Sequence, residues 1–142
     1  MDREIYVPPG GPSRVALPSQ KIYSAMGQEN IFKMIEDFYH ELEQSSLRLM
    51  FPDDMVEASK KSAAFFVGLL GGPLLYQKLY GSPMMRARHM PFPIDEQARQ
   101  EWLACFDRVL ANAVEWYDFP EQHLTGFRLF LQGFSGWMVN KA

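Results

Sequence analysis

The apolar positions of this 142-residue chain repeat with the spacing of helices and do not alternate as they would in strands. Between Glu29 and Gln44 they recur every three or four residues, the period of one helical face, at Ile31, Phe32, Ile35, Phe38, Tyr39 and Leu42. His40 lies off this stripe, and we expect it in solvent. The pattern predicts a helix over 29–44 and, without repeats or heptads, an all-α class.

Three further helices are predicted, over residues 53–70, 95–117 and 120–139. Phe51-Pro52 interrupts the chain before the first of them, and Asp53 or Asp54 is placed to cap it. Gly71-Gly72-Pro73 ends it. The second carries apolar residues on two sides, and the last places His123 in its first turn, where we expect it at the surface.

Two stretches lack this periodicity. Residues 1–20 contain four prolines and several charges, which predicts a flexible or extended arm ahead of one domain at 21–142. Residues 71–93 are rich in proline and glycine, and such a stretch inside a small domain often has a function. We expect a short helix at 83–89 within it.

Composition narrows the classes of function. Hydrophobic residues make up 47% of the chain, enough for one domain with a real core. A single cysteine, Cys105, excludes internal disulfides and multi-cysteine metal sites, and we expect it in the core. A net charge of -3 argues against nucleic acid or a membrane surface as partner. No apolar run reaches membrane-spanning length and no secretory signal is present, so the expected location is cytoplasmic.

The helix predicted over 53–70 has small residues in the middle of its buried face. Spacing assigns to that face Met55, Ala58, Ser62, Phe65 or Phe66, and Leu69. The residues expected to face it are large: Phe38, Tyr39, Phe51 and Trp102. Protein interiors are densely packed, so either these bulky neighbours fill the gap or a flat cofactor lies against the helix. Periodicity alone favours the first explanation.

His89 is the histidine that lies in the irregular stretch, within Met85-Arg86-Ala87-Arg88-His89-Met90-Pro91-Phe92-Pro93. A lone histidine is commonly structural and cannot build a zinc site, which needs three or four protein ligands. One histidine does suffice for haem iron, because the macrocycle supplies the other four nitrogens. Arg86 and Arg88 would then pair with the haem propionates, or else are solvated surface charges.

Several short segments occur in a characteristic order: Phe38-Tyr39, Phe51-Pro52-Asp53-Asp54, Gly71-Gly72-Pro73-Leu74-Leu75-Tyr76, the run from Met85 to Ile94, and Glu101-Trp102-Leu103-Ala104-Cys105. In this order and spacing, over about residues 23–139, the chain resembles the group II truncated haemoglobins. The resemblance implies a shortened globin, in which two pairs of helices form a two-over-two sandwich around a haem.

The resemblance also assigns residues to a site for haem b (iron protoporphyrin IX). His89 would be the proximal iron ligand, and Tyr39 and Trp102 the distal hydrogen-bond donors. Ser62 replaces a larger residue of the family and adds a hydroxyl, whereas Phe51 replaces a residue that often donates. The other assigned residues form the distal pocket (Phe38, Phe51, the gate residue Ala58, Phe65 and Phe66), the propionate contacts (Lys61, Tyr76, Arg86 and Arg88) and the haem packing surface (Leu79 and Phe92).

The function implied is reversible binding of dioxygen and other diatomic ligands, NO and CO. Each donor to a ligand that gains negative charge is worth about 1.5–3 kcal/mol, roughly 10- to 100-fold in affinity, so release would be slow. That suits oxygen, NO or peroxide chemistry better than bulk oxygen transport. As an enzyme the protein would be a nitric oxide dioxygenase or resemble a peroxidase, with an unnamed reductase, as a monomer or homodimer.

Two other readings stay open. One is a haem-based sensor or partner-binding module that uses the arm at 1–20. The other is a cofactor-free helical protein in which His89 is structural.

Overall fold

The computed structural model describes residues 4–12 and 16–142, and within them the chain forms helices and loops without strands. The predicted all-α class is therefore confirmed. Residues 1–3 and 13–15, which belong to the predicted arm, lie outside the described residues. The elements in chain order are α1 (Ile22–Met26), α2 (Gln28–Glu43), the 3-10 helix η1 (Arg48–Met50), α3 (Met55–Leu69), α4 (Leu75–Tyr80), α5 (Met85–His89), α6 (Glu96–Leu110), α7 (Ala113–Tyr117), the 3-10 helix η2 (Glu121–His123) and α8 (Leu124–Met138).

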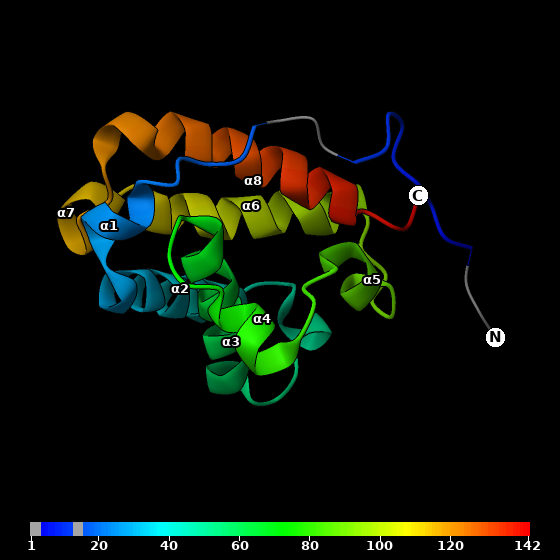
Figure 1. The fold of residues 1–142 in the computed structure, drawn as a ribbon. Helices are drawn as coiled ribbons and strands as arrows, with labels where there is room; N and C mark the ends of the chain where they lie inside the picture. The colour runs from blue at the N-terminus through cyan, green and yellow to red at the C-terminus, as the bar shows by residue number, and fades with distance from the viewer. Residues whose placement is uncertain (1–3, 13–15) are drawn as a thin grey trace.

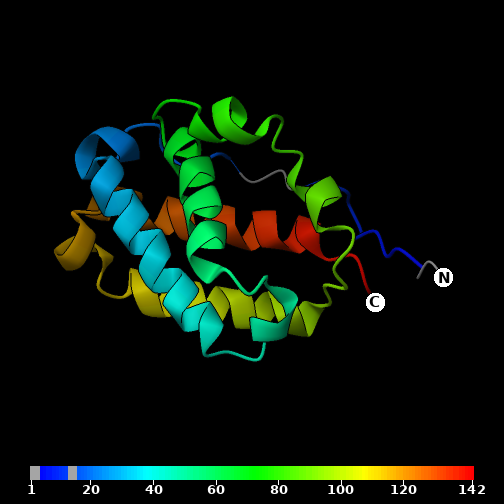
Figure 2. The same ribbon diagram turned by 90° about the horizontal axis from the view of Figure 1, so that it is seen from below.

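Two pairs of helices form two layers. α2 packs on α3, α6 packs on α8, and α2 also contacts α6. Figure 1 shows α6 and α8 running side by side, and Figure 2 shows α2 and α3 crossing them. This is the two-over-two sandwich expected from the sequence.

Aromatic rings join the two layers at their centre. Phe38 of α2 stacks on Phe106 of α6 with ring centroids 4.1 Å apart. Phe66 of α3 and Phe127 of α8 meet the Phe106 ring edge-on, at 5.7 and 5.8 Å. All four side chains are at most 3% exposed. Each such pair stabilises the fold by about 0.5–1.5 kcal/mol beyond the burial of area, so the helices of both layers are tied to one ring cluster.

The helix predicted over 95–117 is in fact two helices. α6 ends at Leu110, Asn112 leaves the helical conformation with φ −117° and ψ 11°, and α7 starts at Ala113. The change of direction brings the Tyr117 hydroxyl to Asp37 of α2, to which it donates at 2.6 Å. The apolar residues on two sides of the predicted helix therefore belong to two shorter helices with different neighbours.

Three other boundaries differ from the expectation. α1 is separated from α2 by Gly27, whose φ is +81°, and α4 lies in the stretch predicted to be irregular. The last helix starts at Leu124, after η2, and not at Pro120. His123 is half-buried beside Ser19, with Nε2 and Oγ 3.3 Å apart, and so is less exposed than expected.

The chain leading into α1 crosses the end of α3 at Gly71-Gly72. Gly71 has φ +104°, and a Cβ there would lie 1.9 Å from the carbonyl oxygen of Gln20. A Cβ on Gly72 would lie 2.6 Å from the ring of Tyr23, whose N–H donates to the Leu70 carbonyl at 2.9 Å. Only glycine permits both the conformation and the close approach. The crossing fixes the end of α3, the helix that lines the cavity described below.

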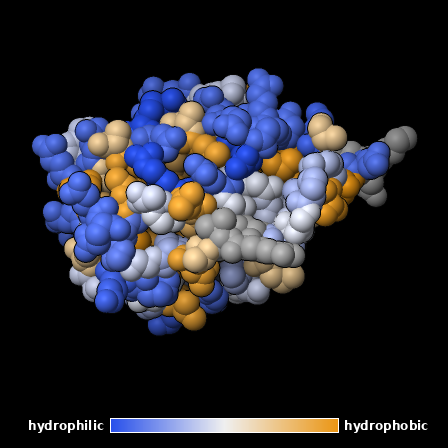
Figure 3. Space-filling model, turned by 90° about the horizontal axis from the view of Figure 1, so that it is seen from above, coloured by the Kyte–Doolittle hydropathy of each residue, from blue (hydrophilic) through white to orange (hydrophobic). Residues whose placement is uncertain are grey.

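The outer surface is mixed in character. On the face seen in Figure 3, apolar side chains are scattered among polar ones. Among the described helices, none has the length and apolar character that crossing a membrane requires.

Candidate functional site

A cavity of about 510 Å³ lies between α3, α5, α6 and α8. Its volume is in the range of about 300–1,000 Å³ that is usual for small-molecule and cofactor sites. Most of the residues predicted for the site line it: Tyr39, Phe51, Ala58, Lys61, Ser62, Phe65, Phe66, Tyr76, Arg88, His89, Phe92 and Trp102. Segments far apart in the sequence thus bring the predicted residues to one space.

His89 stands at the end of α5 with its imidazole half-buried in the cavity wall. Its Nδ1 lies 2.6 Å from the carbonyl oxygen of Met85. A carbonyl can only accept, so Nδ1 carries the proton and donates it, and Nε2 keeps a free lone pair. This is the arrangement that orients histidine for binding a metal through Nε2.

No cluster of metal-ligating side chains accompanies His89. Across the described residues, no group of three or more His, Cys, Asp or Glu side chains is placed to hold a metal ion. A metal bound at His89 must therefore bring most of its own ligands, as an iron porphyrin does.

Tyr39 of α2 and Trp102 of α6 supply polar hydrogens to the cavity wall. Burial raises the pKa of the Tyr39 hydroxyl, and its hydrogen bond with Ser62 acts in the opposite direction. The phenol therefore stays protonated at neutral pH. The Trp102 indole N–H has no hydrogen-bond partner among the described residues. Phe51 packs edge-on against Tyr39, with ring centroids 5.7 Å apart, and contributes no donor.

Two small residues of α3, Ala58 and Ser62, face the cavity and not the core. Ala58, Ser62 and Phe65 are half-buried and line the cavity. The residues of α3 that are buried are Met55, Ser59, Ala63, Ala64, Phe66 and Val67. The predicted buried face of this helix was thus wrong at Ala58 and Ser62. The space beside them is open, so bulky neighbours do not fill it.

Two cations stand at the edge of the cavity, each against an aromatic ring. The Lys61 ammonium lies 5.2 Å from the centre of the Tyr80 ring, and the Arg88 guanidinium lies 5.2 Å from that of Tyr76. Arg88 Nε and Nη2 also donate to the carbonyls of Tyr80, Ser82 and Pro83 at 2.6–3.1 Å. These bonds hold one positive charge in place at the edge, which suits a ligand carboxylate.

Three residues predicted for the site stand outside the cavity lining. Phe38 is 1% exposed and packs edge-on behind Tyr39 and Trp102, with centroids 5.7 and 5.4 Å apart. Leu79 is 64% exposed. Arg86 directs its guanidinium to backbone carbonyls of both terminal segments. Phe38 therefore supports the two donors from behind, whereas Leu79 faces solvent and Arg86 is bonded elsewhere.

Several other residues that line the cavity were not predicted from the sequence: Met85, Ile94, Arg99, Phe134, Ser135 and Met138. Phe134 and Met138 belong to the apolar stripe of the last helix, so the pattern indicated burial but not a cavity. Asn140 was missed for another reason. It is fully buried beyond the end of α8, where no helical period can mark it.

These features fit the haem that the resemblance predicts. The cavity is mainly apolar, one imidazole offers a free Nε2, two donors face the interior, and cations stand at the edge. Haem is a flat apolar plate with two carboxylates on one edge, so each part of it has a counterpart in the wall.

Comparison with known proteins points in the same direction. A family model described as bacterial-like globin matches residues 21–132. The chain is 39% identical over 84 residues to Group 2 truncated hemoglobin YjbI of Bacillus subtilis, covering 58% of this chain and 64% of that protein. It is 28% identical over 104 residues to Two-on-two hemoglobin-3 of Arabidopsis thaliana, covering 70% of this chain and 59% of that protein. The matches thus span less than two thirds of these relatives.

Solved structures are similar over most of the chain. Phosphate-bound Hell's gate globin IV matches with a TM-score of 0.81 and 37% identity, over 90% of this chain and 79% of that one. The group II truncated hemoglobin of Bacillus anthracis gives 0.75 and 31%, over 84% and 90%. The truncated oxygen-avid haemoglobin of Bacillus subtilis gives 0.75 and 32%, over 83% and 98%.

Proposed function

The chain belongs to the bacterial-like globin family, among its group II truncated haemoglobins, and we propose that its cavity binds haem b and, through the iron, dioxygen, NO or CO. Haem binding is implied by membership of the family. The observation that carries it is His89, which lines the cavity and whose Nδ1–H is held by the Met85 carbonyl, so that Nε2 is the ring nitrogen left to bind a metal.

Each part of the cofactor has a proposed partner. When bound, haem supplies an iron with one open coordination position for a diatomic ligand. His89 Nε2 would hold the iron, while Lys61, Tyr76 and Arg88 would hold the propionates. Phe65, Phe66 and Phe92 would pack on the plate. Arg86 has no part in this scheme because, unlike Arg88, it does not line the cavity, and its guanidinium bonds to carbonyls of the two terminal segments.

Tyr39, Ser62 and Trp102 would determine how long a ligand stays. The protonated Tyr39 and the indole of Trp102 donate into the cavity, and Ser62 orients the Tyr39 hydroxyl. A hydrogen bond to a charged acceptor is worth about 1.5–3 kcal/mol, so a ligand that gains negative charge leaves slowly. Slow release favours oxygen, NO or peroxide chemistry over bulk oxygen transport. We further propose that the protein is a cytoplasmic monomer or homodimer that is served by a separate reductase.

Titration of the apoprotein with haemin tests the proposal. The wild type should take up one equivalent, develop a Soret band and keep it through gel filtration. His89→Gly should lose the haem on the column, and added imidazole should restore the band by replacing the missing ligand. His40→Gly is the matched control, because His40 is exposed and distant from the cavity lining. A wild type that takes up no haemin, or an unchanged His89→Gly, would contradict the proposal.

A haem-based sensor is the second candidate function. The observation in its favour is that Tyr6, in the N-terminal arm, accepts a hydrogen bond from Arg86 of the helix that carries His89. An NO electrode distinguishes the two functions when a chemical reductant and dioxygen are supplied. An enzyme consumes many equivalents of NO, whereas a sensor binds about one and stops.

A further inference from the structure

The helix that carries His89 does not maintain its own orientation. α5 has five residues, none of them buried, and isolated helices of that length are unstable in water. Its cap, Met84, has φ +34°, an uncommon left-handed conformation for a residue with a side chain. Contacts from other segments must therefore position the imidazole.

Asn140 bonds to both ends of the segment that follows α5. It is completely buried, and its Nδ2 donates to the carbonyl of His89 at 3.2 Å. Its Oδ1 accepts from the N–H of Ile94 at 2.9 Å, and its own N–H donates to the Ile94 carbonyl at 2.9 Å. Without this side chain the Ile94 N–H would lose its acceptor, and the His89 carbonyl would keep only the bond from the Phe92 N–H. Leaving a half-buried donor unpaired is costlier than losing an exposed hydrogen bond.

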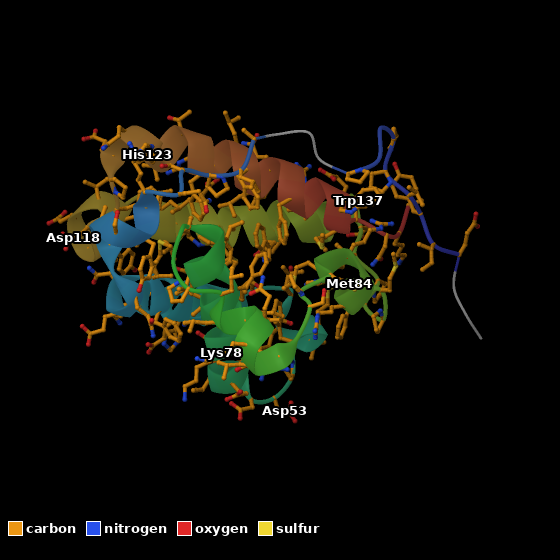
Figure 4. All side chains as sticks on the ribbon, in the orientation of Figure 1. Asp53, Lys78, Met84, Asp118, His123 and Trp137 are labelled. Carbon is orange, nitrogen blue, oxygen red and sulfur yellow. The ribbon has the colours of Figure 1, made fainter. Side chains whose placement is uncertain are left out.

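Arg86 joins α5 to both ends of the chain. Its guanidinium lies 4.3 Å from the centre of the Trp137 ring and donates to the Trp137 carbonyl, to that of Val139 at 2.9 Å and to that of Tyr6 at 2.9 Å. The Tyr6 N–H donates in turn to the Asn140 carbonyl at 3.0 Å. Residues 4–12 and the C-terminus lie at the α5 end of the molecule in Figure 1, as does the labelled Trp137 in Figure 4.

We propose that Arg86, Asn140 and the backbone of Tyr6 form a terminal clasp that positions the proximal histidine. The terminal clasp acts through His89 and contacts neither the haem nor the gas. Its consequence is that the N-terminal segment contributes to the strength of the bond between His89 and iron. The inference rests on the proposed function, since it concerns the residue by which haem is held.

The physical reason is that the clasp opposes any movement of α5. The Met85 carbonyl fixes the imidazole relative to α5, and Asn140 fixes the carbonyl of His89 relative to α8. A tilt of α5 leaves the bond to Met85 intact but must break the bond from Asn140 or the bonds of Arg86. Without the clasp, α5 samples several orientations, so the iron–histidine bond becomes weaker and more heterogeneous.

Three variants remove parts of the clasp. Asn140→Leu removes both polar ends of that side chain at similar size, Arg86→Met removes the guanidinium, and Tyr6→Pro removes the N–H that binds Asn140. Each variant has a control with the same chemical change elsewhere. Asn30→Leu is the control for Asn140→Leu and loses a bond to the Met26 carbonyl at 3.0 Å. Arg128→Met is the control for Arg86→Met and loses a bond to Asp107, and Ile5→Pro is the control for Tyr6→Pro.

Two measurements on the haem-loaded proteins test the clasp. Resonance Raman spectra of the ferrous, ligand-free form report the iron–histidine stretch, and transfer to excess apomyoglobin reports haemin loss. The clasp variants should keep the Soret band and one equivalent of haem, yet show a shifted or broadened stretch. Their haemin loss should be about 10-fold faster, the effect of roughly one hydrogen bond. The controls should match the wild type.

The outcomes separate the two proposals. A wild type that binds no haemin overturns the proposed function, and the clasp with it. Normal haemin binding, with the stretch and the loss rate of clasp variants equal to those of their controls, overturns the clasp alone, even if urea unfolding shows lost stability. If Asn140→Leu does not fold, Arg86→Met and Tyr6→Pro decide, because both positions are only half-buried.

Discussion

Replacing Gly71 by alanine tests whether the crossing at the end of α3 holds the main wall of the cavity. The added Cβ would lie 1.9 Å from the Gln20 carbonyl oxygen and 2.7 Å from its carbon, both backbone atoms. No side-chain rotation relieves such an overlap, so the segment leading into α1 must move. That movement breaks the bond from the Tyr23 N–H to the Leu70 carbonyl, at 2.9 Å, and the bond from Gln20 Nε2 to Leu69, at 2.8 Å.

The magnitude follows from comparison with a glycine in open space. Gly81 also has a positive φ, +87°, but a Cβ there meets nothing within 4 Å. Alanine at either position carries a conformational cost of about 1–3 kcal/mol. Gly71→Ala additionally loses two hydrogen bonds, each worth about 0.5–1.5 kcal/mol. We therefore expect Gly71→Ala to lower the free energy of unfolding by about 1–3 kcal/mol more than Gly81→Ala does.

Urea unfolding of the apoproteins, followed by far-ultraviolet circular dichroism, measures this difference. Equal slopes of the free energy against urea would show that the two variants unfold by the same two-state process. Gly71→Ala should also take up haemin more weakly, because Ala58, Ser62 and Phe65 lie on the displaced helix. Equal losses of stability for both variants would show that the crossing does not hold α3.

The site and the core yield three further predictions. Tyr39→Phe and Trp102→Phe should each speed dioxygen dissociation about 10- to 100-fold in stopped flow, and unchanged rates would refute their role as donors. Ala58→Trp should slow CO rebinding after flash photolysis if ligands enter past α3; an unchanged rate places the entry elsewhere. Burial raises the pKa of Tyr117, so stability is full below pH 10, where unfolded tyrosine titrates, and falls above it. Tyr117→Phe should therefore cost about 1.5–3 kcal/mol at pH 7 and flatten this alkaline decline in urea unfolding.

Helical periodicity predicted α2, α3 and α8 because each runs for at least four turns. The capping prediction also holds, since the Asp54 side chain accepts from the Glu57 N–H at 3.0 Å. Helical periodicity did not predict α1, α4 and α7, which have five or six residues. Fewer than two turns display no period, and the break at Asn112 depends on contacts with α2 that the sequence does not reveal.

The residues in and around the candidate site also divide into those that could be predicted from the sequence and those that could not. His89, Tyr39 and Trp102 could be selected from the sequence because residue type and order carry the resemblance. The placement of Arg86 could not, because its acceptors lie 51, 53 and 80 positions away along the chain. Asn140 depends equally on long-range pairing, with His89 at a separation of 51. Side chains that bond to backbone carbonyls leave no pattern in composition or spacing.

The two layers and the proximal segment are stabilised by different means. The cluster around Phe106 joins α2, α3, α6 and α8 through rings that are almost fully buried, so these helices pack on one another independently of the cavity. α5 contributes no buried residue and is held by hydrogen bonds to the chain ends. Apolar burial is non-directional, whereas hydrogen bonds depend strongly on angle and distance. A rigid aromatic core therefore suits the wall that shapes the cavity, and a directional clasp suits His89, the residue proposed to hold the iron.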